Sequence, residues 1–157
     1  MKVLGLFSKP YLDYNCFQRG FDDPRQIRIQ MESAACQEIF IQAQTEKITL
    51  AWSFIHEDET NLCPFLDRKY SVLGMVSLCK IKVPPKTEIA EQALLFQQLV
   101  NLSSKDALHL ACAVSIQADF FLTCDDSLKK QAQKLELAIA IMNPIDYIRN
   151  NENYGNQ

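Results

Sequence analysis

Glycine is scarce in this sequence: only four of the 157 residues are glycine, and they do not cluster. A loop that cradles a phosphate group with its backbone N–H groups needs several glycines close together. The sequence therefore argues against a small-molecule phosphatase, or a similar hydrolase, that depends on such a loop.

The sequence also lacks a CxxC pair. Its six cysteines are spread along the chain, mostly inside apolar runs, at Cys16, Cys36, Cys63, Cys79, Cys112 and Cys124. This distribution favours buried free thiols in a reducing compartment over disulfides or a zinc site.

No apolar stretch approaches the length of a membrane span, and residues 1–7 lack the length and the cleavage site of a signal peptide. We therefore expect a cytoplasmic protein that does not enter a membrane.

Positive charge is not in excess either, since the net charge is -3. This argues against a broadly basic nucleic-acid binder, although a local cationic rim remains compatible with it. With 48% hydrophobic and 22% charged residues, the composition is that of a globular protein, and the length suits one domain.

Short apolar runs alternate with segments of helical periodicity. The first core strand is predicted to end within 11–15, and further strands to cover 48–53, 81–83, 120–123 and 138–142. Helices are predicted over about 24–45, 56–64, 89–100, 103–118 and 127–135. Pro10 is expected to interrupt the chain before the first core strand, and residues 65–79 carry mixed helical faces. The alternation predicts an α/β fold whose mainly parallel sheet is covered by helices on both sides. We expect one domain over 1–149, with 1–9 as an N-terminal extension and 150–157 as a frayed polar tail.

Acidic residues lie at the predicted junctions between elements. The candidates are Asp13, Glu59 with Glu57 as its alternative, Asp106, and Asp125 with Asp126 as its alternative. Each has a simpler interpretation: Asp106 fits a capping box, Asp125 or Asp126 fits a helix N-cap, and the glutamates fit a solvated helix face. Asp13 is the hardest to explain in this way, because a carboxylate at the end of an apolar strand needs a partner.

The conjunction of these acids is more informative than any one of them. If the strands that end at Asp13 and Asp125 are neighbours, the carboxylates converge, and their mutual repulsion is relieved by a divalent cation. Oxygen ligands without a histidine and cysteine cluster favour Mg²⁺ or Mn²⁺, held here by Asp13, Asp106 and Asp125. The substrate that suits such a site is a phosphodiester.

Four motifs in this order and spacing resemble the PIN-domain ribonucleases: YLDYN (11–15), Ser53 followed by Glu59, KDALHLA (105–111) and FLTCDD (121–126). The closing NPIDYI (143–148) is similar to the bacterial VapC-like branch. The resemblance covers about residues 10–149. It implies a Rossmann-like three-layer α/β fold and an endoribonuclease, dependent on Mg²⁺ or Mn²⁺, that hydrolyses RNA with Asp13, Glu59, Asp106 and Asp125.

The resemblance also implies that the protein is the toxin of a toxin-antitoxin pair. Its expected partners are an antitoxin protein and a second copy of the chain. Asn15 and Thr123 match positions that orient the carboxylates in the family. Two features depart from the family: Tyr14, where a small hydroxylated residue is common, and the N-terminal extension. The alternative function is a noncatalytic RNA- or protein-binding module that retains the fold.

Other polar residues near the motifs have competing interpretations. Five basic side chains flank the acids in sequence and could bind RNA phosphates or could simply be solvated: Arg19, Arg25, Lys105, Lys129 and Lys130. His109 lies one helical turn from Asp106, but a core histidine is the more common outcome. His56 has no assigned role, and Cys124 is expected to be a buried thiol rather than a nucleophile.

Overall fold

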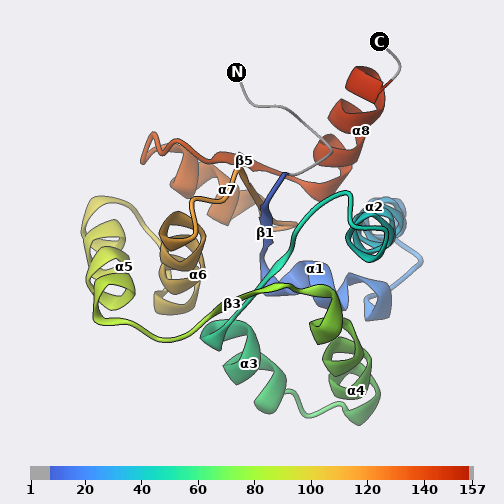
Figure 1. The fold of residues 1–157 in the computed structure, drawn as a ribbon, viewed down its shortest axis with the longest axis horizontal. Coiled ribbons are helices and arrows are strands. Elements are labelled where there is room, and N and C mark those ends of the chain that lie inside the picture. The colour runs from blue at the N-terminus through green and yellow to red at the C-terminus, as the bar shows by residue number, and fades with distance from the viewer. Residues whose placement is uncertain (1–7, 156–157) are drawn as a thin grey trace.

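Short parallel strands alternate with helices along the chain (Figure 1). The computed structural model describes residues 8–155, with side chains described up to residue 151. Within this range the strands are β1 (Pro10–Leu12), β2 (Ala51–Ser53), β3 (Ile81–Val83), β4 (Phe120–Leu122) and β5 (Ala140–Met142). The α-helices are α1 (Tyr14–Gln18), α2 (Ile27–Gln44), α3 (Phe54–Asn61), α4 (Leu66–Met75), α5 (Thr87–Leu99), α6 (Ser104–Ser115), α7 (Asp126–Gln133) and α8 (Pro144–Gly155), with 3-10 turns at Arg19–Phe21 and Val76–Leu78.

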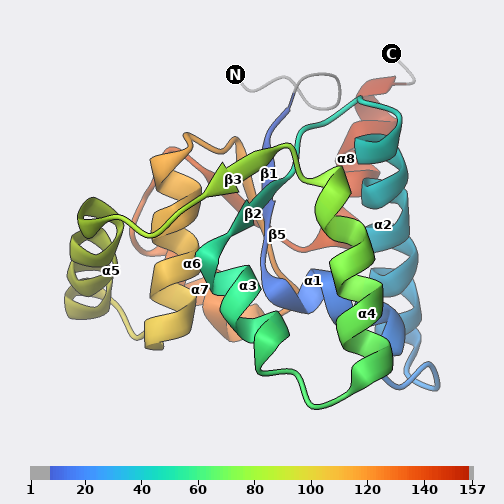
Figure 2. The same ribbon diagram turned by 60° about the horizontal axis from the view of Figure 1, so that its bottom comes forward.

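The strands form two small parallel sheets. One has the order β1-β4-β5 and the other pairs β2 with β3. A single parallel bridge between Ser8 and Ile48, with the Thr49 N–H donating to the Ser8 carbonyl at 3.0 Å, links the segments that lead into β1 and β2. In Figure 2, α1 and α3 begin at the same end of the sheets, where β1 and β2 finish. Side chains that follow these strands are thus brought to one edge.

Alternate strand residues face two different cores, as expected of a sheet buried on both faces. Tyr11 and Phe121 pack with residues of α5, α6 and α7. Leu12 and Leu122 point to the opposite side and pack with residues of α1, α2 and α4 and with Tyr147 of α8. Figure 1 shows the corresponding arrangement, with α5 and α6 on one side of β1 and α2 on the other. The protein therefore has three layers.

Most predicted elements agree with the structure to within a few residues at their ends. Three differences have a clear description. Pro10 begins β1 instead of interrupting the chain, because a first strand position does not require an N–H donor. β2 is shorter than the predicted strand over 48–53, since Ile48 makes only an isolated bridge. α8 continues through residues 150–155, where a frayed tail was predicted. Residues 1–7 of the predicted extension, and 156–157, lie outside the described residues.

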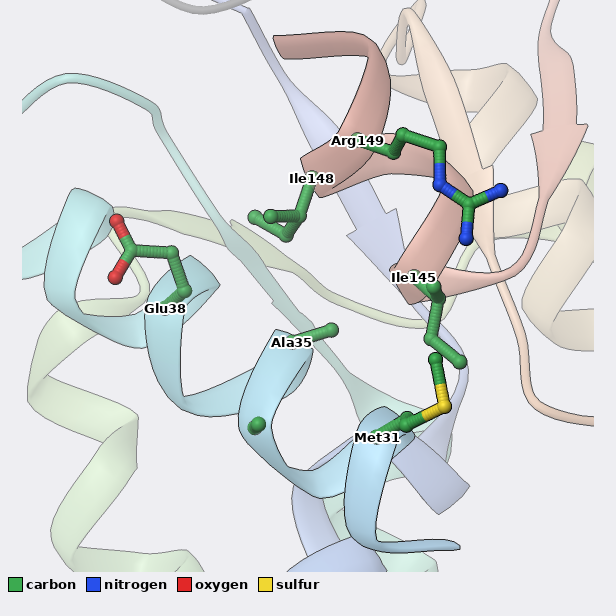
Figure 3. Close-up of a pocket in the computed structure, with 7 residues that line it drawn as sticks. Met31, Ala35, Glu38, Ile145, Ile148 and Arg149 are labelled. Atoms are coloured by element: carbon green, nitrogen blue, oxygen red, sulfur yellow. The ribbon is translucent and has the colours of Figure 1, made fainter. Parts of the chain in front are cut away.

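A groove of about 410 Å³ separates α2 from α8 on the protein surface. Figure 3 shows Met31 of α2 pointing toward Ile145 of α8, with Glu38 and Arg149 on the two sides of the groove. None of the predicted site carboxylates lines it. In the part of the chain that the structure describes, no helix combines the length and the apolar composition needed to cross a bilayer.

Candidate active site

Asp13 connects β1 to α1 and is held by three hydrogen bonds. Its Oδ1 accepts from the Tyr14 N–H at 2.8 Å, which caps α1. Its Oδ2 accepts from the Thr123 hydroxyl at 2.7 Å and from the Asn15 amide at 3.0 Å. The structure thus places both predicted supporting residues against Asp13. Because β1 pairs with β4 in register, Leu12 lies opposite Leu122 and the two strand ends are neighbours, as predicted.

Three of the predicted carboxyl groups are harder to ionise than usual. Burial raises the pKa of Asp13 to about 7; the Thr123 hydrogen bond opposes this, and the nearby Asp106 and Glu59 add to it. Burial also raises the pKa of Glu59 to about 7. The pKa of Asp106 is raised by burial and, against a hydrogen bond with Ser103, by the charges of Asp125 and Glu59. The four acids are therefore close enough to interact electrostatically.

Asp125 and Asp126 follow β4 but point to different partners. Asp125 is an N-cap, as the simpler interpretation predicted, because its Oδ1 accepts from the N–H groups of Ser127 and Leu128 at 2.9 and 3.1 Å. It also lies close enough to Asp106 to raise the pKa of that group. Asp126 instead forms an ion pair with Arg28 at 2.7 Å. Asp125, not Asp126, faces the other acids.

The two glutamates of α3 also diverge. Glu59 has a side chain that is 13% exposed, and it influences the pKa of both Asp13 and Asp106. Glu57 is exposed and accepts a hydrogen bond from the Trp52 indole N–H at 2.8 Å. Residues two apart on a helix point in different directions, so only one of them can face the site. The structure places Glu59 there.

His109 holds Glu59 in position. Its Nε2 lies 2.6 Å from Glu59 Oε1, and its Nδ1 lies 2.7 Å from the Tyr11 hydroxyl. Burial lowers the pKa of His109 to about 3, so the ring is neutral. We therefore assign the proton to Nε2, which donates to Glu59, while Nδ1 accepts from Tyr11. The predicted core histidine is indeed buried, but it also contacts the site, and its one-turn spacing from Asp106 was the available sequence signal.

His56 has a purely structural environment. Its Nδ1 accepts from the Ser53 N–H at 2.9 Å and completes a capping box at the start of α3. Its Nε2 donates to the Leu12 carbonyl at 2.7 Å. His56 thus fixes α3 against β1.

The predicted basic residues lie in different surroundings. Lys105 is beside the acids, with its Nζ 4.0 Å from Glu59 Oε2 and most of its side chain exposed. Lys130 is exposed and Lys129 partly buried on α7. Arg19 is bound to the buried Glu32 and to Asp22, and Arg25 pairs with Asp23. Lys105 is the cation placed closest to the site, whereas Arg19 and Arg25 are neutralised by their own partners.

The donor set fits a hard divalent cation. All donors are carboxylate oxygens. Burial is the main cause of their raised pKa values, the neighbouring acids add to it for Asp13 and Asp106, and a bound cation would favour the ionised forms. Among the described residues, no three of these acids have carboxylate oxygens that all lie within 4.8 Å of one another. Mg²⁺ does not require three direct carboxylate ligands, because it uses one or two and retains several water ligands.

The comparisons with known proteins concern the fold. No protein-family model matches the chain, and no curated protein is similar to it. The structure is similar to a chain in the crystal structure of VapBC2 from Rickettsia felis bound to a DNA fragment from their promoter, with a TM-score of 0.54. The match covers 86% of this chain and 98% of that chain at 14% sequence identity, so it carries information on fold alone. It confirms the predicted Rossmann-like, three-layer α/β fold of the PIN type.

Proposed function

We propose that the protein is an endoribonuclease, dependent on Mg²⁺ or Mn²⁺, that hydrolyses phosphodiester bonds of RNA and serves as the toxin of a toxin-antitoxin pair. The observation that carries this proposal is the convergence of Asp13, Glu59, Asp106 and Asp125, from four separate segments, at one edge of the sheets. The similarity in fold to a chain of a VapBC2 complex supports it.

Asp13, Asp106 and Asp125 would hold the cation. When bound, such an ion supplies an activated water and stabilises the charge that develops on the phosphate. Thr123 and Asn15 orient Asp13 through the hydrogen bonds to its Oδ2. Their role is to keep that carboxylate in one rotamer while the charge around it changes.

Glu59 is the proposed general base. A pKa of about 7 lets its carboxylate both accept and release a proton near neutral pH. His109 occupies Oε1, so Oε2, on the side of Lys105, is the oxygen that takes the proton from the attacking water. Lys105 lies where it can contact a phosphate of the RNA.

An antitoxin would need an apolar surface to bind, and the beginning of α4 offers one. Leu62 is 82% exposed, and Phe65, Leu66 and Tyr70 are each exposed by more than half. Exposed apolar side chains of this kind suit a protein-protein interface. Leu94, Leu95 and Leu99 of α5 are also exposed and would suit a homodimer.

The function is tested by cleavage of single-stranded RNA by the purified protein with Mg²⁺, with Mn²⁺, or with EDTA. We expect cleavage that requires the metal and is lost in Asp13→Asn. Asp58→Asn, which removes an exposed carboxylate of the neighbouring helix α3, should cleave as the wild type does. Equal, metal-independent cleavage by all three proteins would identify a contaminating nuclease. RNA binding without cleavage by freshly prepared wild type would favour the noncatalytic module.

A further inference from the structure

Three cysteines from distant parts of the chain meet beside the end of β4. Cys16 lies on α1, Cys36 on α2, and Cys124 between β4 and α7. Their sulfur atoms all lie within 4.8 Å of one another, and all three residues are buried. In the part of the chain that the structure describes, no other group of three histidine, cysteine or acidic side chains has its ligand atoms this close together. The sequence predicted buried free thiols at these positions, and the three cysteines are free and buried.

The spacing of the sulfurs suits coordination of a single ion. A metal about 2.3 Å from each of three sulfurs holds them roughly 4 Å apart. Sulfur atoms that lie within 4.8 Å of one another would therefore move by less than about 1 Å to bind it. α1 and α2 pack directly against each other, and Arg28 ties α2 to the Cys124 carbonyl at 3.2 Å. The three ligands are therefore held together by packing that does not depend on the sulfurs.

The three thiols are hydrogen-bonded to one another. Hydrogen bonds from Cys124 and Cys16 lower the pKa of Cys36, with burial and Glu32 opposing this, whereas the pKa values of Cys16 and Cys124 are raised. The protons of Cys16 and Cys124 would therefore leave only as the ion binds.

We propose that Cys16, Cys36 and Cys124 form a binding site for one soft d10 metal ion, Zn²⁺ or Cu⁺, distinct from the carboxylate site. Sulfur donors select such ions, whereas Mg²⁺ and Mn²⁺ prefer oxygen. Binding forms three metal–sulfur bonds, and the protons of the ligating thiols pass to the buffer.

An ion bound at this site would affect the acidic site through the hydrogen bonds that Cys124 and Cys16 make. The Cys124 N–H donates to Asn15 Oδ1 at 3.3 Å, and the Cys16 thiol lies 3.5 Å from the Leu122 carbonyl. An ion shared by Cys16 and Cys124 would tie α1 to the segment between β4 and α7. The expected consequence is a more stable protein, whether or not the chain cleaves RNA.

The test is an anaerobic titration of the reduced, full-length protein with Zn²⁺ or Cu⁺ in competition with a chromogenic chelator. We expect one ion per chain, undisturbed by excess Mg²⁺, and a higher melting temperature. X-ray absorption of the zinc-loaded wild type should show three sulfur ligands at about 2.3 Å.

Cys36→Ala is the informative variant, because Cys36 lies on α2, away from the acidic motifs. It should weaken binding by about 100-fold or more. Cys79→Ala removes another buried thiol, outside the group, and should bind as the wild type does. The proposal is overturned if Cys36→Ala binds as tightly as Cys79→Ala, if the reduced wild type binds neither ion, or if fewer than three sulfurs surround the zinc. The sulfur count applies even where Cys36→Ala fails to fold.

Discussion

Replacing Asp13 with asparagine should make the metal-free protein more stable at pH 8 while abolishing its proposed activity. The carboxylate of Asp13 is almost fully buried, and its pKa of about 7 lies well above the ordinary value of 3.8. Between these two pH values the folded state binds more protons than the unfolded state. The free energy of unfolding therefore falls as pH rises from about 4 to 7, and the penalty persists above pH 7.

The structure sets the size of the effect. Each tenfold change in proton affinity corresponds to about 1.4 kcal/mol, so the difference between 3.8 and about 7 gives a penalty of roughly 4 kcal/mol. Asparagine keeps the cap on Tyr14 N–H, but its amide nitrogen cannot accept the hydrogen bonds that Thr123 and Asn15 donate to Asp13 Oδ2, a loss of about 1 kcal/mol each. The net gain for Asp13→Asn at pH 8 is thus about 2 kcal/mol.

Urea unfolding in EDTA, followed by the fluorescence of the single tryptophan, Trp52, measures this gain. The advantage of Asp13→Asn should disappear below about pH 4, where Asp13 is protonated in both states, and should shrink when Mg²⁺ is added. Asp58→Asn is the control, since its carboxylate is exposed on α3. The reasoning is wrong if Asp13→Asn is less stable than wild type at pH 8, or if the difference between the two proteins does not change with pH.

Three further substitutions separate neighbouring roles. Glu59→Gln should lower RNA cleavage by at least about 100-fold, whereas Glu57→Gln should leave it within a few fold; equal losses in a cleavage assay would contradict the assignment of Glu59. His109→Ala removes the donor that favours ionised Glu59, so the acidic limb of the pH–rate profile should move to higher pH, and an unmoved limb would count against this role. Glu32→Ala leaves Arg19 without its buried partner and should lower the free energy of unfolding in urea by about 3 to 5 kcal/mol; a loss below about 1 kcal/mol would show that the ion pair is dispensable.

The alternation of short apolar runs with helical segments was sufficient to predict the layered fold. β3 has the predicted ends, and β4 and β5 differ from the predictions by one or two residues. Local propensity and burial determine these elements, and both are written in consecutive residues. The pairing of β1 with β4, which places Asp13 beside Thr123, agrees with the hypothesis that these strand ends are neighbours, but it joins segments far apart in the sequence.

Contacts between distant segments were not predictable in the same way. The choice of Glu59 over Glu57 depends on the direction in which α3 leaves β2. The internal role of Arg19 depends on Glu32, a buried acid of α2 that sequence spacing did not single out. The meeting of three thiols likewise requires the packing of α1 against α2 beside the end of β4. Such features arise from tertiary geometry, which a single sequence encodes only indirectly.

The division of the strands into two groups affects how Glu59 is positioned. Asp13 and Asp125 follow strands that are hydrogen-bonded to each other, so backbone geometry fixes their separation. Glu59 follows β2, which belongs to the other group. Apart from the backbone bridge between Ser8 and Ile48, the bonds near the site that join the two groups involve side chains: Tyr11 to Ser53, His56 to the Leu12 carbonyl, and His109 to Glu59. Side-chain hydrogen bonds, rather than strand pairing beside the site, therefore set the distance between the proposed base and the aspartates.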